Sequence, residues 1–429
     1  MPPPTLRIIA GASLVTTLGA LPPFLVGAQA VVIARDLALD PARLGVVVAT
    51  FFGAAALGAV LGGGLVDRVG RRWGLVLAGT LVSSGGLGLA LLAHSWWALV
   101  AAMVVLGLAN AACQVTSNLA MASAIPPGRR GLGFGVKQAA VPTAILLGGL
   151  AVPTVTLTLG WRATFVTTGT AGLLLLAGGL LGSGREARPV RRAAGLDRPA
   201  TAPLVVIAVS ITLASAAANS LGTFLAGWAH QAGLTVAEAG LLLAAGAVCS
   251  IVVRVIVGYR ADRRHGANLP RVAAMMAVGA AGLTAVSFPL LPPVLIGALA
   301  AFAVGWAWPG LLLFAVARLG RDTPALASGV VQAGAFVGGA LGPVLFGVAA
   351  GGLGYPVAWR LAAGCFLAAA VLALVARRMF RADLRARPPR EPLGYGGGRE
   401  QPLYWAGRPA DDTNGPEAAP SRERSGPEG

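Results

Sequence analysis

The chain has few charged residues for its length of 429, and lysine and histidine are nearly absent. Charged residues make up 11% of the sequence and hydrophobic residues 56%. So few charges do not cover the surface of a soluble protein of this size, whereas a surface in contact with lipid does not require them. The shortage of charge therefore excludes an ordinary soluble domain and favours a protein embedded in a membrane.

Cysteine is also scarce. The three cysteines, Cys113, Cys249 and Cys365, fall inside apolar runs, with no spacing typical of a metal site or a disulfide framework. They are interpreted as small packing residues. No metal site and no cofactor are predicted.

Long apolar runs without strand-like alternation dominate what remains. A helix needs roughly 20 apolar residues to cross the hydrocarbon core, and helices satisfy their own backbone groups there. The sequence therefore predicts an all-α membrane protein with twelve transmembrane helices, at about 6–33, 44–66, 73–93, 97–124, 131–157, 163–182, 202–229, 237–258, 270–290, 293–318, 325–350 and 358–380.

The formal net charge of +17 is distributed as expected for a membrane topology. Most arginines outside the C-terminal tail fall on one set of connections, and the opposite set carries only Arg35, Arg43, Arg162 and Arg360. The positive-inside rule then places both termini in the cytoplasm, in a multi-pass protein of the cytoplasmic (inner) membrane. The basic excess is a topological signal, so no nucleic-acid partner is predicted. The expected surroundings are the lipid bilayer, and the chain is expected to be a monomer.

A charged loop occurs twice. The stretch GGLVDRVGRR at 63–72 has a relative, GYRADRRHG at 258–266, and Asp262 follows Asp67 by 195 positions. Two further matches have similar offsets: GVKQA at 135–139 with GVVQA at 329–333, and Trp161-Arg162 with Trp359-Arg360. Repeats of this kind indicate a duplicated bundle with a substrate site between the halves.

An Arg-rich polar stretch separates the two halves. The predicted organisation is an N-terminal six-helix bundle (1–182), a cytoplasmic hinge loop (183–201), a C-terminal six-helix bundle (202–381) and a disordered cytoplasmic tail (382–429).

With these motifs the chain resembles the major facilitator superfamily of secondary transporters. The resemblance covers about 6–380 and rests on Gly63, Leu65, Asp67, Arg68, Gly70, Arg71 and Arg72, and in the second copy on Gly258, Asp262, Arg263 and Gly266. It implies two pseudo-symmetric bundles that work by alternating access. It also implies that Asp67 and Asp262 cap helices of the other half and latch the cytoplasmic side shut. The alternative is that these loop charges set only the topology.

Two features of particular branches of that family are missing. An arginine associated with proton-coupled members would fall at about Met103, and the Gly-Pro signature of drug antiporters is absent from the helix at 131–157. Gly342-Pro343 lies instead in the helix at 325–350. Both absences weigh against a proton-driven drug exporter.

Two cations fall within the predicted helices. Lys137, the single lysine, lies roughly 9 Å from a helix end, and Arg254 about 6 Å. A buried cation is costly, so a function is expected unless the side chain extends to the headgroups. Their repeat partners, Val331 and Ala59, are uncharged, and no acidic residue lies in a predicted helix core. The resemblance implies that the helices at 131–157 and 237–258 face each other across a central cavity. Two cations placed in this way indicate an anion site.

Amide side chains in the helices are candidates to complete that site. They are Asn110, Gln138, Asn219 and Gln332, of which Gln138 and Gln332 are equivalent in the repeat and also fit an architectural role. The predicted function is a transporter of a small anion, either an organic carboxylate or an inorganic oxyanion.

Two other functions stay open: export of drugs or amphiphiles, and a non-transporting membrane sensor. The segment at 129–142 is also similar to bacterial metabolite and cyanate-type permeases. The coupling ion and the direction of transport are left open by the sequence.

Overall fold

The computed structural model describes residues 3–124, 137–182, 200–263, 268–319 and 324–387, and over these ranges the chain is helical with no strand. The first half contains α1 (Pro3–Ala28), α2 (Ala30–Leu37), α3 (Pro41–Leu92), α4 (Trp96–Ala124), α6 (Ala140–Ala151), the π-helical turn η2 (Val152–Thr156), α7 (Leu157–Leu159) and α8 (Trp161–Leu181). The second half contains α9 (Thr201–Gln231), α10 (Val236–Arg263), α11 (Asn268–Val286), α12 (Leu291–Ala300), the π-helical turn η3 (Ala301–Gly305), α13 (Trp308–Leu319), α14 (Pro324–Leu353) and α15 (Tyr355–Ala386).

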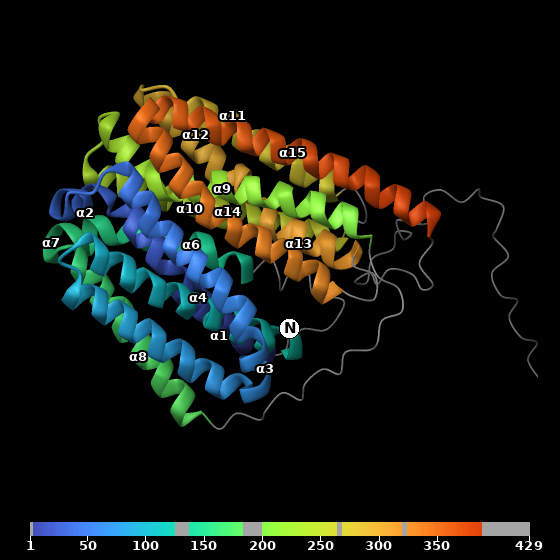
Figure 1. Ribbon diagram of the computed structural model, residues 1–429, viewed down its shortest axis with the longest axis horizontal. Coiled ribbons are helices and arrows are strands. Elements are labelled where there is room, and N and C mark those ends of the chain that lie inside the picture. The colour runs from blue at the N-terminus through green and yellow to red at the C-terminus, as the bar shows by residue number, and fades with distance from the viewer. Residues whose placement is uncertain (1–2, 125–136, 183–199, 264–267, 320–323, 388–429) are drawn as a thin grey trace, which may run out of the picture.

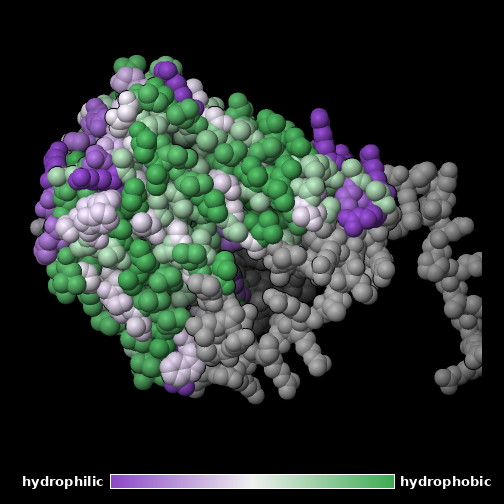
Figure 2. All heavy atoms as spheres, in the orientation of Figure 1, coloured by the Kyte–Doolittle hydropathy of each residue, from purple (hydrophilic) through white to green (hydrophobic). Residues whose placement is uncertain are grey.

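Twelve stretches are long and apolar enough to cross a membrane, which confirms the twelve predicted helices. Two of them lie within α3, where Gly70 interrupts the helix with φ 80° and ψ 174°. Glycine adopts this positive φ without steric cost, so the chain turns between two spans at the duplicated motif. Large apolar side chains such as Leu14, Val60 and Leu345 are exposed. Figure 2 shows apolar side chains over much of one face of the molecule, as expected for contact with lipid.

The helices form two bundles, α1–α8 and α9–α15, lying side by side (Figure 1). We call the end at which α8 finishes and α9 starts the hinge end. The short helices α2 and α7 lie at the opposite end, which we call the far end (Figure 1).

The bundles touch most closely toward the far end. A methyl group added to Gly45 of α3 would lie 2.2 Å from the Pro343 carbonyl oxygen of α14. One added to Gly149 of α6 would lie 2.4 Å from the Gly240 carbonyl oxygen of α10. Backbones pack this closely only where a side chain is missing. The two halves therefore meet through glycines toward the far end.

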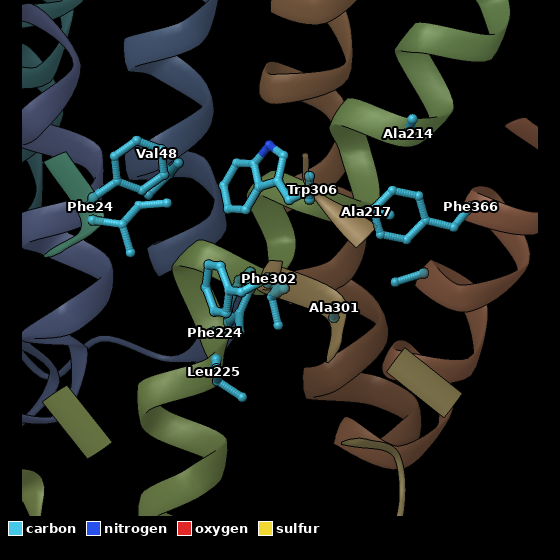
Figure 3. Packing of buried hydrophobic residues seen from close by; sticks show 14 of the residues in the cluster. Phe24, Val48, Ala214, Ala217, Phe224, Leu225, Ala301, Phe302, Trp306 and Phe366 are labelled. Atoms are coloured by element: carbon cyan, nitrogen blue, oxygen red, sulfur yellow. The ribbon is translucent and has the colours of Figure 1, made fainter. Parts of the chain in front are cut away.

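Aromatic rings fill the centre of the contact. The ring of Trp306 lies 5.9 Å from that of Phe24 on α1 and 5.7 Å from that of Phe302 in η3, measured between ring centroids. Figure 3 shows these side chains between the helices of the two halves. The buried cluster is therefore continuous across both bundles.

The internal repeat is visible in the backbone. Gly160 and Gly354 precede α8 and α15 with nearly identical angles, φ 85° ψ 158° and φ 85° ψ 157°. They lie 194 positions apart, the offset of the GVKQA match. The sequence match of Trp161 with Trp359 is therefore wrong by one helical turn, because Tyr355 begins the second helix.

The predicted segment boundaries hold only in part. Helix α15 continues to Ala386, past the boundary at 381. Most of the predicted hinge and the tail beyond 387 lie outside the described residues.

Candidate functional site

Arg254 forms hydrogen bonds with carbonyl oxygens of both bundles, next to the aromatic side chains described above. It lies on α10, is 4% exposed, and donates from Nη1 to the Gln138 carbonyl oxygen at 2.5 Å. Its Nη2 donates to the carbonyl oxygen of Trp306. Its Nε has no hydrogen-bond partner among the described residues. The guanidinium therefore contacts neutral oxygens from both halves and keeps one buried donor unused.

The Trp306 carbonyl lies at a break in a membrane-spanning helix. After η3, Trp306 leaves helical geometry with φ −106° and ψ 13°, and α13 begins two residues later at Trp308. Arg254 satisfies a carbonyl at the end of the first segment, as basic side chains do at helix C-termini. The second segment, α13, begins inside the membrane-spanning stretch, so the positive end of its helix dipole lies there. Its first turn contains no acidic residue that would compensate this partial charge.

Trp308 adds a second unused donor. Its side chain is 2% exposed, and its Nε1 has no partner among the described residues. A buried donor left unpaired costs roughly 1–3 kcal/mol. The break at Trp306 thus gathers an arginine, a helix N-terminus and an indole N–H, all of which suit an anion. Sequence reasoning treated 293–318 as one helix and missed this feature, although Pro309 and Gly310 are a signal for interruption.

Lys137 lies next to this contact in the chain, because it precedes Gln138. It is 8% exposed, and its Nζ donates to Oδ1 of Asn118 on α4. The carboxylates of Asp36, Asp40 and Asp383 pair with other arginines, and none of the described residues forms an ion pair with Lys137 or Arg254. Arg254 therefore contacts the residue that follows Lys137, and neither cation has a neutralising acid in the described part of the chain.

The remaining amide candidates are dispersed. Asn110 on α4 is buried, and its Oδ1 has no partner among the described residues. Asn219 donates from Nδ2 to the Ser215 carbonyl oxygen of its own helix at 2.9 Å, so this donor is satisfied locally. Gln332 is half-buried on α14. Gln138 meets Arg254 through its backbone carbonyl. A role for these four side chains in binding substrate stays a prediction.

The duplicated loops are only partly described. Arg72 donates to the carbonyl oxygens of Gly179 at 3.2 Å and Leu180 at 2.8 Å, which fastens the first loop to the end of α8. Arg71 is half-buried beside it. The side chains of Asp67, Arg68, Asp262 and Arg263 lie outside the described residues. The latch therefore stays a prediction.

Two six-helix bundles, a repeated loop at the hinge end and a polar break at mid-membrane define a secondary-transporter scaffold. Comparison with protein families agrees: the model of the Major Facilitator Superfamily matches residues 6–321 and 207–410. The chain belongs to this superfamily.

Similar proteins are known as whole structures and as a partial sequence match. Two crystal structures of a bacterial homologue of the human lysosomal transporter Spinster, inward-facing and either unoccupied or occupied, have TM-scores of 0.65 and 0.68 at 17% identity. The alignments cover 89% of this chain and 97% and 99% of those chains.

The sequence is also 30% identical over 144 residues to YwtG of Bacillus subtilis (strain 168), which is named as a candidate metabolite transport protein. That match spans 34% of this chain and 31% of YwtG, about a third of each. It supports a transporter and leaves the substrate to be argued from the residues.

Proposed function

We propose that this transporter moves a small anion, an organic carboxylate or an inorganic oxyanion, by alternating access between its two bundles. The observation that carries the proposal is Arg254, a buried guanidinium held by carbonyl oxygens of both halves and paired with no acid among the described residues. Lys137 adds a second buried cation beside the Gln138 contact.

The energetic argument is that unpaired buried charge is retained only where something compensates for its cost. Placing a cation at the centre of a membrane helix costs about 2.5–3.5 kcal/mol on insertion scales. Carbonyl oxygens recover part of this, and an anion would recover more, since charge-assisted hydrogen bonds to a carboxylate are stronger than neutral ones. The unused Nε of Arg254 and Nε1 of Trp308 are donors of the required kind.

The break before α13 supports the same substrate class. Discontinuous membrane helices direct the positive ends of their half-helices toward anionic groups of the cargo. Here α13 begins two residues after Trp306, whose carbonyl oxygen accepts from Arg254. Because Arg254 also contacts Gln138 of the other bundle, an anion competing for this guanidinium would act directly on the contact between the halves.

We further propose that the hinge end faces the cytoplasm of a cell whose inner membrane holds the chain as a monomer. The support is the arginine distribution along the sequence. In that orientation the glycine contacts between the bundles lie toward the outer side of the membrane.

Uptake into proteoliposomes with a panel of labelled anions tests the proposal. We expect saturable flux of at least one anion, lost in Arg254→Ala and reduced in Lys137→Ala. Arg254→Lys keeps the charge without the planar fork and should restore flux only partly. Arg43→Ala is the matched control, because it also removes an arginine but one that is exposed and paired with Asp40. Intact flux in both cation variants would refute the anion site.

Export of an amphiphile is the second candidate function, favoured by the aromatic rings of Phe24, Phe302 and Trp306 at the centre of the contact. Saturable transport of a lipophilic cation, unaffected by Arg254→Ala, would select it. A chain that moves neither class of compound would favour the sensor.

A further inference from the structure

A polar contact joins the bundles at the far end, separate from the Arg254 site. Arg35 on α2 extends its guanidinium toward His230, near the end of α9, with Nη2 and Nε2 3.3 Å apart. Both residues line a far-end pocket of about 280 Å³, whose walls come from α2 and α3 of one bundle and α9 and α15 of the other. The contact therefore exists only while the far end is closed.

The partners of His230 determine its protonation state. Arginine has only donors, so Nε2 of His230 must accept from Arg35. Nδ1 lies 2.7 Å from the carbonyl oxygen of Leu234, which has no proton to give, so Nδ1 carries the hydrogen. In this arrangement the imidazole ring is neutral.

Protonation would remove the contact. A proton on Nε2 would direct a donor at the donors of Arg35 and place two positive charges within hydrogen-bond distance. Like charges so placed repel, and histidine gains its proton between about pH 5 and 8. Acid at the far face would thus favour separation of the bundles at that face.

Each described carboxylate near this pair already accepts a hydrogen bond from another group. Asp36, next to Arg35, accepts hydrogen bonds from Trp161 and Arg162. The surrounding elements also carry Asp40, which lines the same pocket and accepts from the Arg43 amide, Glu238, which accepts from Thr235, and Tyr355, which stacks on Trp228. Their other charged groups at this end are the arginines Arg43, Arg162 and Arg360. The ring of His94 forms its hydrogen bond with the Leu91 carbonyl oxygen of its own bundle.

We propose that His230 is a proton-binding site that controls closure of the far end: the neutral ring holds the bundles together through Arg35, and protonation releases them. His230 is half-buried and lines the far-end pocket. A proton that binds one conformation more tightly than the other shifts the population toward the conformation that it prefers. The proposal goes beyond the anion site and holds whatever the cargo is.

Distance measurement between two spin labels tests it in the full chain. The labels replace Leu159 and Leu290, exposed residues at the far ends of opposite bundles, and the three native cysteines are replaced by alanine. Between pH 8 and pH 5 the ratio of open to closed distances should rise about threefold to fivefold, the range for losing an exposed pair of this kind. The readout is a distance and not a flux, so its failure is distinct from failure of the proposed function.

Variants assign the response. His230→Gln keeps an acceptor but does not titrate, and should stay closed at both pH values. Arg35→Gln should be more open at pH 8 and respond less to acid. His94→Gln is the matched control and should respond like the parent chain. An unchanged distance in the parent, a full response in His230→Gln, or loss of response in His94→Gln would each overturn the proposal.

Discussion

At the scale of single residues, two tryptophans, Trp308 and Trp359, each have a buried indole N–H without a hydrogen-bond partner among the described residues, but their surroundings differ. Trp308 begins α13 at the break that Arg254 caps, whereas Trp359 lies on α15 with its ring edge on Phe346. An unused donor weakens folding in both places, but only the first lies where an anion is expected.

Trp308→Phe should therefore weaken transport without weakening the fold. Removing the indole N–H leaves most of the packing, and the KM for the transported anion should rise roughly tenfold, the loss of about one hydrogen bond to a charged group. Thermal unfolding in detergent should be unchanged or higher. Trp359→Phe should show the same stability and an unchanged KM. Equal KM values in the two variants would contradict a role for Trp308 in binding.

The candidate residues show what a sequence discloses at this scale. Lys137 and Arg254 were predictable because an unpaired cation in an apolar run is rare and costly. The partners of Arg254 were not, because a carbonyl oxygen becomes available only where a helix breaks, and that depends on φ and ψ at Trp306. Nothing in the sequence ranked Asn219 below the other amide candidates, but in the structure its Nδ2 donates to a carbonyl oxygen of its own helix.

At the scale of elements, the far end of the first bundle is tied by one carboxylate. Asp36 on α2 accepts from Nε1 of Trp161 at 2.9 Å and from Nη1 of Arg162 at 2.7 Å. Arg162 also donates to the Ala93 carbonyl oxygen after α3. The hydrogen bond from Trp161, then that from Arg162, hold the pKa of the Asp36 carboxyl below its ordinary value of 3.8. Helices α2, α3 and α8 thus share one charged junction.

Asp36→Asn should destabilise the chain in a pH-dependent manner. Because the folded pKa is lowered, the carboxylate stabilises the fold above the ordinary pKa, and this stabilisation is lost as pH falls through the lowered value. The difference in unfolding temperature between parent and variant should be present at pH 7, corresponding to roughly 0.5–1 kcal/mol for a partly exposed pair. It should shrink below about pH 4.

A double-mutant cycle with Arg162→Gln isolates the ion pair from other effects of the substitution. A coupling energy near zero at pH 7 would show that the junction is held by the Trp161 hydrogen bond alone.

The elements themselves were largely predictable. Length and hydropathy determine how often the chain crosses the membrane, and all twelve spans agree. The break in the span 291–317 was not predicted, because a π-helical turn adds one residue per turn without changing composition. The predicted match of Trp161 with Trp359 was wrong by one helical turn. The two Trp-Arg pairs are alike in sequence, but Trp161 begins α8 whereas Trp359 lies inside α15.

At the scale of the whole molecule, the proposed alternating access requires a second conformation besides the described one. The far end closes through glycines that allow backbone contact between bundles, and through the pair Arg35 and His230. Toward the hinge end, Arg254 and Gln138 carry the contact. Opening the far end therefore requires that the glycine contacts separate, and any substitution that prevents their approach shifts the population toward the opposite state.

Gly45→Ala is the sharpest test of that balance. The added methyl group would lie 2.2 Å from the Pro343 carbonyl oxygen, so closure costs backbone displacement on α3 or α14. Overpacking of this kind costs about 1–3 kcal/mol, which shifts the closed-to-open ratio by one to two orders of magnitude. Hydrogen–deuterium exchange should therefore rise at the far ends of α3 and α14.

Gly53→Ala on the same helix is the control, because no atom lies within 4 Å of its added methyl group. Both variants gain the same helix propensity, so faster exchange in Gly45→Ala alone isolates the contact between the bundles. Equal exchange in both would mean that the far end closes without the close approach of α3 to α14.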